Sequence, residues 1–151
     1  MSEVLFYHLE RRTLEDALPS LVERTLARGW KAAIRTESAE RAGAIDRLLW
    51  TYDAESFLPH GLAAEPDADH QPVLIGPDES GSNGADVLFV VGGASPPVWD
   101  GAGFVRIVLM FDGHDPAAVQ TARAAWKEAK AAGHSITYWK ENDAGKWEKQ
   151  G

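Results

Sequence analysis

Cysteine is absent from the 151-residue sequence, and this excludes both disulfides and metal sites built on thiolates. Long apolar runs are missing as well. Charged residues interrupt every stretch before it reaches the roughly 18 apolar residues that a membrane-spanning helix needs. Nothing near Met1 combines a positively charged head with an apolar run, as a signal peptide would. We therefore expect a cytoplasmic protein that does not cross a membrane.

Positive charge is scarce, with 15 lysines and arginines against 23 acidic residues and a net charge of -8. A surface of this kind repels a phosphate backbone unless its basic residues gather on one face. Direct nucleic-acid binding is thus disfavoured at the outset. The length and the hydrophobic content of 44% fit one domain with a single core.

Six short apolar stretches have the length and the β-branched or aromatic content of buried strands. These stretches are residues 3–9, 31–36, 72–75, 86–91, 104–111 and 135–139.

Three amphipathic helices are predicted between these strands, each with a capping residue at its start. Their limits are Thr13 and Gly29, Ser38 and Trp50, and Asp115 and Gly133. The third helix has the preferred arrangement at both ends, with proline in the first helical position and glycine after the last.

The alternation of strands and helices predicts an α/β fold, a single-domain and mostly parallel sheet flanked by helices. Residues 51–71 hold no sustained period and are expected to form a long connection. We assign residues 1–140 to the domain and residues 141–151 to a polar C-terminal tail that frays.

The glycine-rich loop of a dinucleotide-binding site is missing. Such a site needs glycines at the first strand-to-helix turn, where the pyrophosphate approaches bare backbone. Here that turn reads "LERRTLED", which holds no glycine and carries acidic residues that repel an anion. The later "VVGGASPP" follows a strand, but paired prolines replace the start of a helix. We expect a sheet without a nucleotide-binding loop, and no cofactor.

Metal and catalytic signals are weak. The stretch "PHGLAAEPDADH" holds His60, Asp67, Asp69 and His70, but spacing along a loop fixes no coordination geometry. Solvated turn residues are the favoured interpretation, so no metal is expected. No glycine-flanked serine or catalytic pair is singled out either. A nucleotide- or metal-dependent α/β enzyme is therefore the weaker alternative.

The predicted third helix carries a basic edge. Arg123, Lys127 and Lys130 fall along one side of the stripe expected to pack on the sheet. That stripe is Val119, Ala122, Trp126 and Ala129. A tryptophan bordered by cations suits a partner that is both anionic and apolar. The alternative is a solvated face that favours the negative end of the helix dipole, with Trp126 in the core.

Two aromatic residues, Trp50 and Phe57, stand at the exit of the second helix and in the connection after it. They would either form a small apolar cluster beneath a long loop or make an exposed patch that marks a protein interface.

Several of these stretches together carry a family resemblance. They are "LLWTYDAESFLPHGLA", "DADHQPVLI", "DVLFVV" and "ARAAWKEAKAAGHSITYWK". In this combination the sequence resembles the chi subunit of bacterial DNA polymerase III from about Val4 to Lys140. The most distinctive part joins Trp50 to Glu55-Ser56-Phe57, to Pro59-His60 and to the later Asp-His-Gln-Pro block.

The resemblance implies a non-catalytic accessory protein of the clamp-loader assembly, with a Rossmann-like fold and no nucleotide. It implies binding of the acidic C-terminal tail of single-stranded DNA-binding protein, which ends in proline and phenylalanine. The tail site would fall on Arg123, Trp126 and Lys127, with Lys130 beside them and Phe111 completing an aromatic pocket. A second surface including Trp50 and Phe57 would bind the psi subunit or a repair helicase.

The sequence departs from the family pattern at two positions of the expected tail site. Trp126 stands where a tyrosine is expected, and Val119 stands where a lysine is expected. The tail would therefore meet less positive charge here, and Arg123 would carry more of the binding. A direct binder of single-stranded DNA remains a further alternative, with strongly salt-dependent affinity for a bare oligonucleotide.

Overall fold

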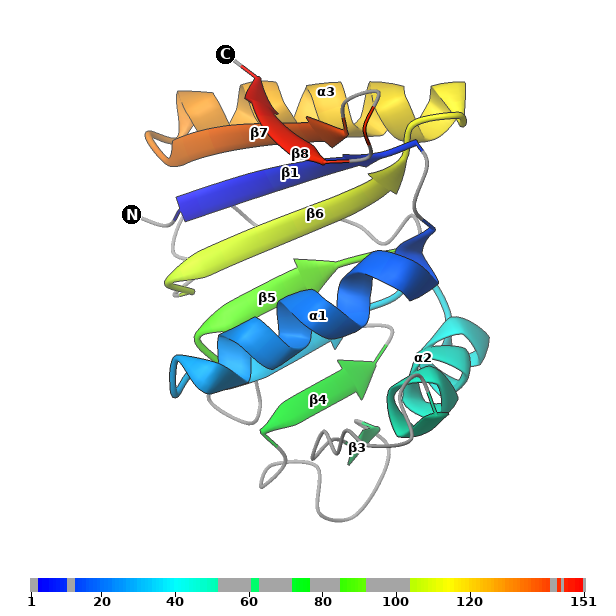
Figure 1. Cartoon of the computed structure of the whole chain (residues 1–151). Helices are drawn as coiled ribbons and strands as arrows, with labels where there is room; N and C mark the ends of the chain where they lie inside the picture. Colours follow the sequence, from blue (N-terminus) through cyan, green and yellow to red (C-terminus); the bar gives the residue numbers. More distant parts are fainter. Residues whose placement is uncertain are drawn as a thin grey trace.

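The computed structural model describes residues 3–10, 13–51, 61–62, 72–76, 85–91, 104–141, 144 and 146–150, without the side chains of residues 50, 51, 61, 62 and 150. Within these ranges the chain forms one sheet and three helices (Figure 1). The helices are α1 (Leu14–Ala27), α2 (Ala39–Thr51) and α3 (Pro116–Ala131). The strands are β1 (Glu3–Leu9), β2 (Ala32–Arg35), β3 (Gly61–Leu62), β4 (Val73–Gly76), β5 (Val87–Val90), β6 (Arg106–Asp112), β7 (Ser135–Glu141) and β8 (Trp147–Gln150).

The strands lie in the order β3-β4-β2-β5-β6-β1-β7-β8. All neighbouring pairs are parallel except β7 and β8, which are antiparallel. The predicted α/β class with a mostly parallel sheet is therefore confirmed. The six predicted strands correspond to β1, β2, β4, β5, β6 and β7, and β3 and β8 were not predicted.

The three helices begin where their capping residues predict. Thr13 accepts a hydrogen bond from the Asp16 N–H, and the Asp16 carboxylate accepts one from the Thr13 N–H, both at 3.3 Å. Ser38 Oγ accepts from the Arg41 N–H at 3.1 Å, and Asp115 Oδ1 accepts from the Ala117 N–H at 3.0 Å. These bonds satisfy backbone donors that a helix leaves free in its first turn.

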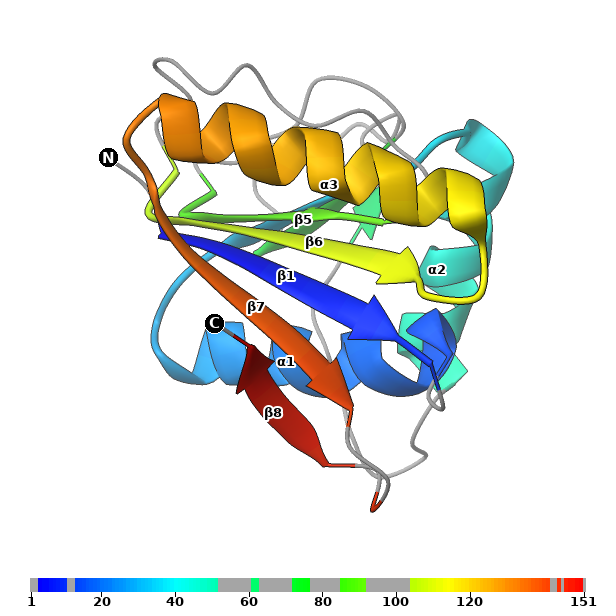
Figure 2. The same cartoon turned by 90° about the horizontal axis from the view of Figure 1, so that it is seen from above.

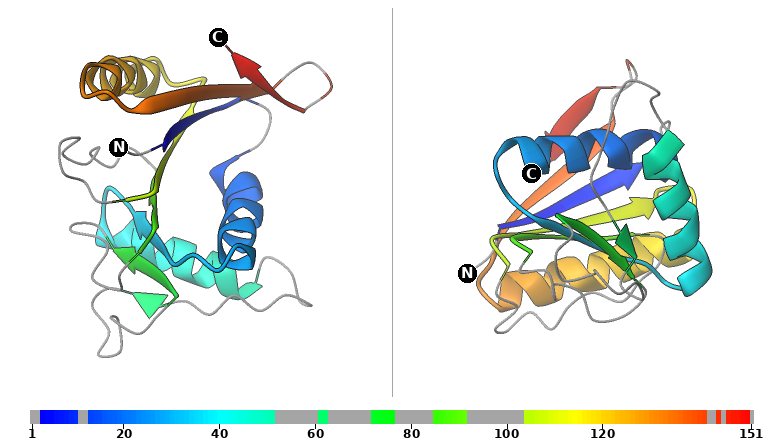
Figure 3. Two further views of the ribbon diagram at one scale, coloured as in Figure 1. Left: turned by 90° about the vertical axis from the view of Figure 1, so that its left-hand side faces the viewer. Right: turned by 90° about the horizontal axis from the view of Figure 1, so that it is seen from below.

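The helices divide between the two faces of the sheet. Figure 2 shows α3 on one side and α1 on the other, and Figure 3 shows the same layers from two further directions. α1 and α2 pack on a core that includes Leu18 and Ile34, whereas α3 packs on a core that includes Phe6 and Leu109. Two hydrophobic cores thus lie on opposite faces of one sheet.

The C-terminal segment differs from the prediction. Residues 141–151 were expected to fray, but Trp147–Gln150 forms β8 and extends the sheet beside β7. The Trp147 ring meets the edge of Tyr7 with centroids 5.0 Å apart, and Tyr7 stacks on Trp139 at 6.4 Å. Packing of the Trp147 ring on Tyr7 thus adds to the pairing with β7 in an otherwise polar strand. The division into a domain and a tail stays a prediction.

No helix in the described ranges is both long and apolar enough to span a lipid bilayer.

Candidate functional site

α3 lies close to the sheet because the side of the helix that faces it consists of alanine. Ala122, Ala125 and Ala129 are buried against Phe6 and the neighbouring strands. The predicted stripe is confirmed for Ala122 and Ala129, and the partly buried Trp126 packs against the same core. Ala125, which was not predicted, belongs to the stripe as well, whereas Val119 does not. Bulky residues on β1 and β6 already fill the space beneath the helix, so only small side chains fit between them and α3. The larger Trp126 side chain is only half-buried.

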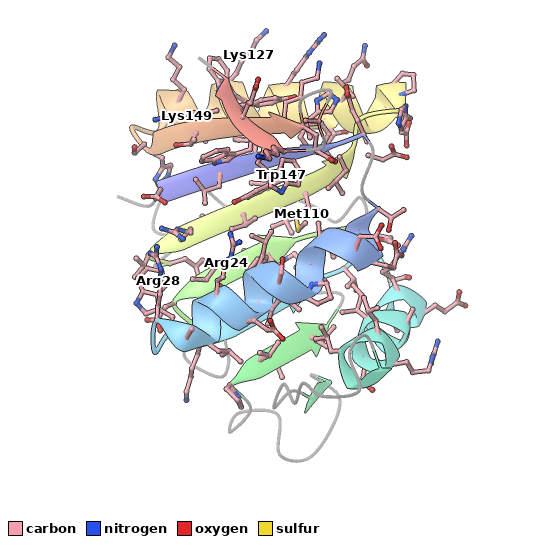
Figure 4. The ribbon with its side chains drawn as sticks, viewed as in Figure 1. Arg24, Arg28, Met110, Lys127, Trp147 and Lys149 are labelled. Carbon is pink, nitrogen blue, oxygen red and sulfur yellow. The ribbon has the colours of Figure 1, made fainter. Side chains whose placement is uncertain are left out.

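The predicted basic edge is present on α3. Arg123, Lys127 and Lys130 are all exposed, and Figure 4 shows Lys127 pointing outward from the helix. Among the described residues, no carboxylate forms an ion pair with Arg123 or Lys127. The Lys130 Nζ atom lies 4.9 Å from the centroid of the half-buried Trp126 ring, a cation–π contact. These side chains are therefore available to an anionic partner that also offers an apolar group.

Phe111 lies at the end of β6, on the same side of the sheet as α3. Parallel pairing places it opposite His8 of β1, and the two rings meet at an angle with centroids 5.1 Å apart. Tyr138 of β7 lies 6.1 Å from Phe111 and stacks on Phe6 at 6.3 Å. The partly buried rings of Phe111, Trp126 and Tyr138 all pack against the core under α3. The predicted aromatic pocket residue thus has aromatic neighbours that sequence reasoning did not name.

A chain of polar contacts starts within this aromatic cluster. The Nδ1 atom of His8 lies 2.6 Å from the Tyr138 hydroxyl. Its Nε2 atom lies 3.1 Å from Oε1 of Glu10, close enough for an ion pair but not aligned as a hydrogen bond. The same Glu10 oxygen lies 3.4 Å from the Nζ atom of Lys140. Residues from β1 and β7 are therefore linked by charge at the carboxyl ends of their strands.

The turn after β6 closes over His8. Gly113 donates its N–H to the Leu9 carbonyl at 2.7 Å, and His114 donates its Nε2–H to the Glu10 carbonyl at 2.7 Å. A Cβ atom on Gly113 would collide with the His8 ring, so only glycine allows this approach. β1 leads to α1 on one face and β6 to α3 on the other, so their ends form the switch point where doubly wound sheets bind ligands. In this protein the hydrogen bonds of Gly113 and His114 join the end of β6 to the end of β1.

Burial and charge act against each other on His8. Burial of the ring lowers the pKa of His8 from its usual value, because desolvation penalises the imidazolium, while the Glu10 carboxylate raises it. Lys140 and His114 add smaller lowering effects. Burial also raises the pKa of Tyr138, and the positive charge of Arg123 opposes this shift. Arg123 is thus close enough to act electrostatically on the Tyr138 hydroxyl.

The side chains of the second predicted surface and of the candidate metal ligands are not among those that the structure describes. Trp50 is in the last turn of α2, but its side chain is not described, and Phe57 is outside the described residues. The candidate metal ligands His60, Asp67, Asp69 and His70 are outside them as well. Within the described ranges, no three acidic or histidine side chains are grouped to hold a metal ion.

Known proteins with similar sequences point to a single family. Residues 1–137 match the model of the family described as DNA polymerase III chi subunit, HolC. The DNA polymerase III subunit chi of Escherichia coli (strain K12) is 30% identical over 144 residues, which cover 90% of this chain and 96% of that protein. The probable DNA polymerase III subunit chi of Rickettsia prowazekii (strain Madrid E) is 28% identical over 91 residues, 60% of this chain and 55% of that protein. Because the family match spans most of the sequence, this chain belongs to the DNA polymerase III chi subunit family.

Proposed function

We propose that this protein is a non-catalytic accessory subunit of DNA polymerase III that links the replicase to single-stranded DNA-binding protein. It does so by holding the acidic C-terminal tail of that protein against α3. The family supplies the place in DNA replication. The observation that carries the tail proposal is the exposed basic edge of α3 beside Trp126 and Phe111, on a protein with a net charge of -8.

The chemistry of the edge suits the two kinds of group in the tail. Arg123 presents a planar fork of N–H donors that can bind a terminal carboxylate through two parallel hydrogen bonds. Lys127 and Lys130 add point charges that attract aspartates. The rings of Phe111 and Trp126 offer apolar surface to the final phenylalanine. Trp50 and Phe57 are proposed to contact a second protein, the psi subunit of the clamp loader or a repair helicase.

Titration with a fluorescent peptide that copies the acidic tail tests this proposal. We expect saturable binding that is lost when the final phenylalanine is deleted, because the aromatic anchor then has no partner. Added salt should weaken the binding, since exposed charges are screened over about 10 Å at 0.1 M ionic strength.

A bare single-stranded oligonucleotide is the matched competitor for this titration. It should not displace the peptide, because an acidic protein gains little from phosphates alone. Equal binding of both peptides, or displacement by the oligonucleotide, would contradict the proposal. Displacement would favour direct binding of single-stranded DNA.

A further inference from the structure

The hydrogen bond between His8 and Tyr138 can run in either of two directions. The two atoms that it joins, His8 Nδ1 and the Tyr138 hydroxyl oxygen, are 2.6 Å apart. A neutral histidine carries one N–H, whereas an imidazolium carries two. A tyrosine hydroxyl has a single proton to donate but can also accept. The tautomer and the protonation state of His8 therefore decide which group donates in this pair.

We assign the proton of neutral His8 to Nε2, because the negative Glu10 carboxylate lies 3.1 Å from that atom. Nδ1 is then an acceptor, and the Tyr138 hydroxyl must donate to it. The hydroxyl has no second proton, so it presents only lone pairs to anything else that approaches. A carboxylate placed beside Tyr138 would then gain no hydrogen bond from it.

Protonation of His8 reverses this bond. Nδ1 then carries a proton and donates to the Tyr138 oxygen, and the hydroxyl proton turns to a new acceptor. The half-buried Tyr138 packs on the same core as Phe111 and Trp126, and the charge of Arg123 reaches it. The freed O–H donor would thus lie within the candidate tail site.

Each strand or turn that packs near His8 contributes a charged or titratable side chain. Glu10 follows β1, Lys140 lies on β7 and His114 lies in the turn after β6. The positive charge of Arg123 on α3 acts on the Tyr138 hydroxyl. The Glu10 carboxylate favours the imidazolium, whereas Lys140 and burial oppose it. These opposing effects leave His8 able to change its charge when an anion binds nearby.

We propose that Tyr138 is a second anchor for the terminal carboxylate of the tail beside Arg123, and that protonation of His8 frees the Tyr138 hydroxyl to donate its proton to that carboxylate instead of to His8. This inference rests on the proposed function of the α3 edge. Binding and protonation then favour each other, because a carboxylate that accepts from Tyr138 stabilises the imidazolium. The tail itself keeps its charge above about pH 5, so the pH dependence arises in this protein.

The sign of the pH effect follows from the shift of His8. Its pKa in the free protein is lowered by burial, so the ring is mostly neutral at neutral pH. Tail binding raises this pKa and takes up a proton. Affinity should therefore increase as the pH falls, by about tenfold between about pH 8 and about pH 5.5, as one additional charge-assisted hydrogen bond forms.

The experiment is to measure the affinity for the tail peptide at both pH values for the wild type and for Tyr138→Phe, which removes the hydroxyl alone. At about pH 8 the two should bind equally, since the wild-type hydroxyl donates to His8 and not to the ligand. At about pH 5.5 the variant should bind roughly tenfold more weakly. His134→Asn, which changes a histidine just before the start of β7, at the opposite end of the sheet from His8, should keep the full pH dependence.

A structural role for Tyr138 would give a different pattern, with equal weakening at both pH values, and this result would overturn the inference. Equal pH dependence in the wild type and in Tyr138→Phe would overturn it too. An NMR titration of His8 provides an independent readout, because its pKa should rise when the peptide binds. Absence of peptide binding at every pH would overturn the proposed function together with the inference, whereas binding without pH dependence would overturn the inference alone.

Discussion

Replacing Arg123 with alanine should weaken binding of the acidic tail peptide by roughly tenfold to a hundredfold, or about 1.5–3 kcal/mol. This is the range for hydrogen bonds to a charged group, and a bidentate guanidinium lies at its upper end. The expected loss is large because Val119 supplies no charge one turn before Arg123 on α3. Titration of the fluorescent tail peptide measures the effect.

Two variants separate the geometry of Arg123 from its charge. Arg123→Lys keeps the positive charge but loses the planar fork, so it should recover only part of the affinity. Arg24→Ala makes the same change in net charge on α1, which lies on the other face of the sheet (Figure 4), and should leave binding unchanged. Equal losses in Arg24→Ala and Arg123→Ala would show that overall charge, and not a site on α3, governs binding.

Replacing Phe6 with alanine should lower the free energy of unfolding by about 3–5 kcal/mol. The Phe6 side chain is fully buried on the α3 side of β1 and stacks on Tyr138. The helix above it offers only alanines at its buried face, so no larger side chain can move in to fill the cavity. Urea unfolding followed by tryptophan fluorescence and by circular dichroism measures the change.

Val105→Ala is the matched control for this stability prediction. Val105 is 49% exposed next to the start of β6, and its truncation should change the free energy of unfolding by no more than about 0.5 kcal/mol. Unfolding of Phe6→Ala at the same urea concentration as Val105→Ala would contradict the burial of Phe6 between the sheet and α3.

Much of the fold could be predicted because its signals are local. The cap at Thr13 and the proline after Asp115 fix helix starts, and buried parallel strands read as short apolar runs. β8 could not be predicted in this way, because its one aromatic residue packs on a core that includes Tyr7, which lies at the other end of the chain. β3 has two residues, too few for any periodic pattern.

The candidate site was predicted less completely than the fold. Helical spacing groups Arg123 with Lys127 and Lys130, since neighbours on one helix are near in sequence. The same spacing did not separate the half-buried Trp126 from the fully buried alanines. Helical periodicity gives the direction in which a side chain points from the helix axis, but not how deeply it is buried. His8 and Tyr138 lie 130 positions apart, and only the pairing of β1 with β7 brings them together. The surface at Trp50 and Phe57 stays a prediction.

The most direct test of the central claim is an NMR titration of isotopically labelled protein with the tail peptide, which reports where the tail binds. Binding at the α3 edge predicts that the largest amide shift changes cluster at Phe111, Arg123, Trp126 and Tyr138, while the amides of α1 on the opposite face stay unchanged. Largest changes around Trp50 and Phe57, or no changes at saturating peptide, would contradict a tail site on α3.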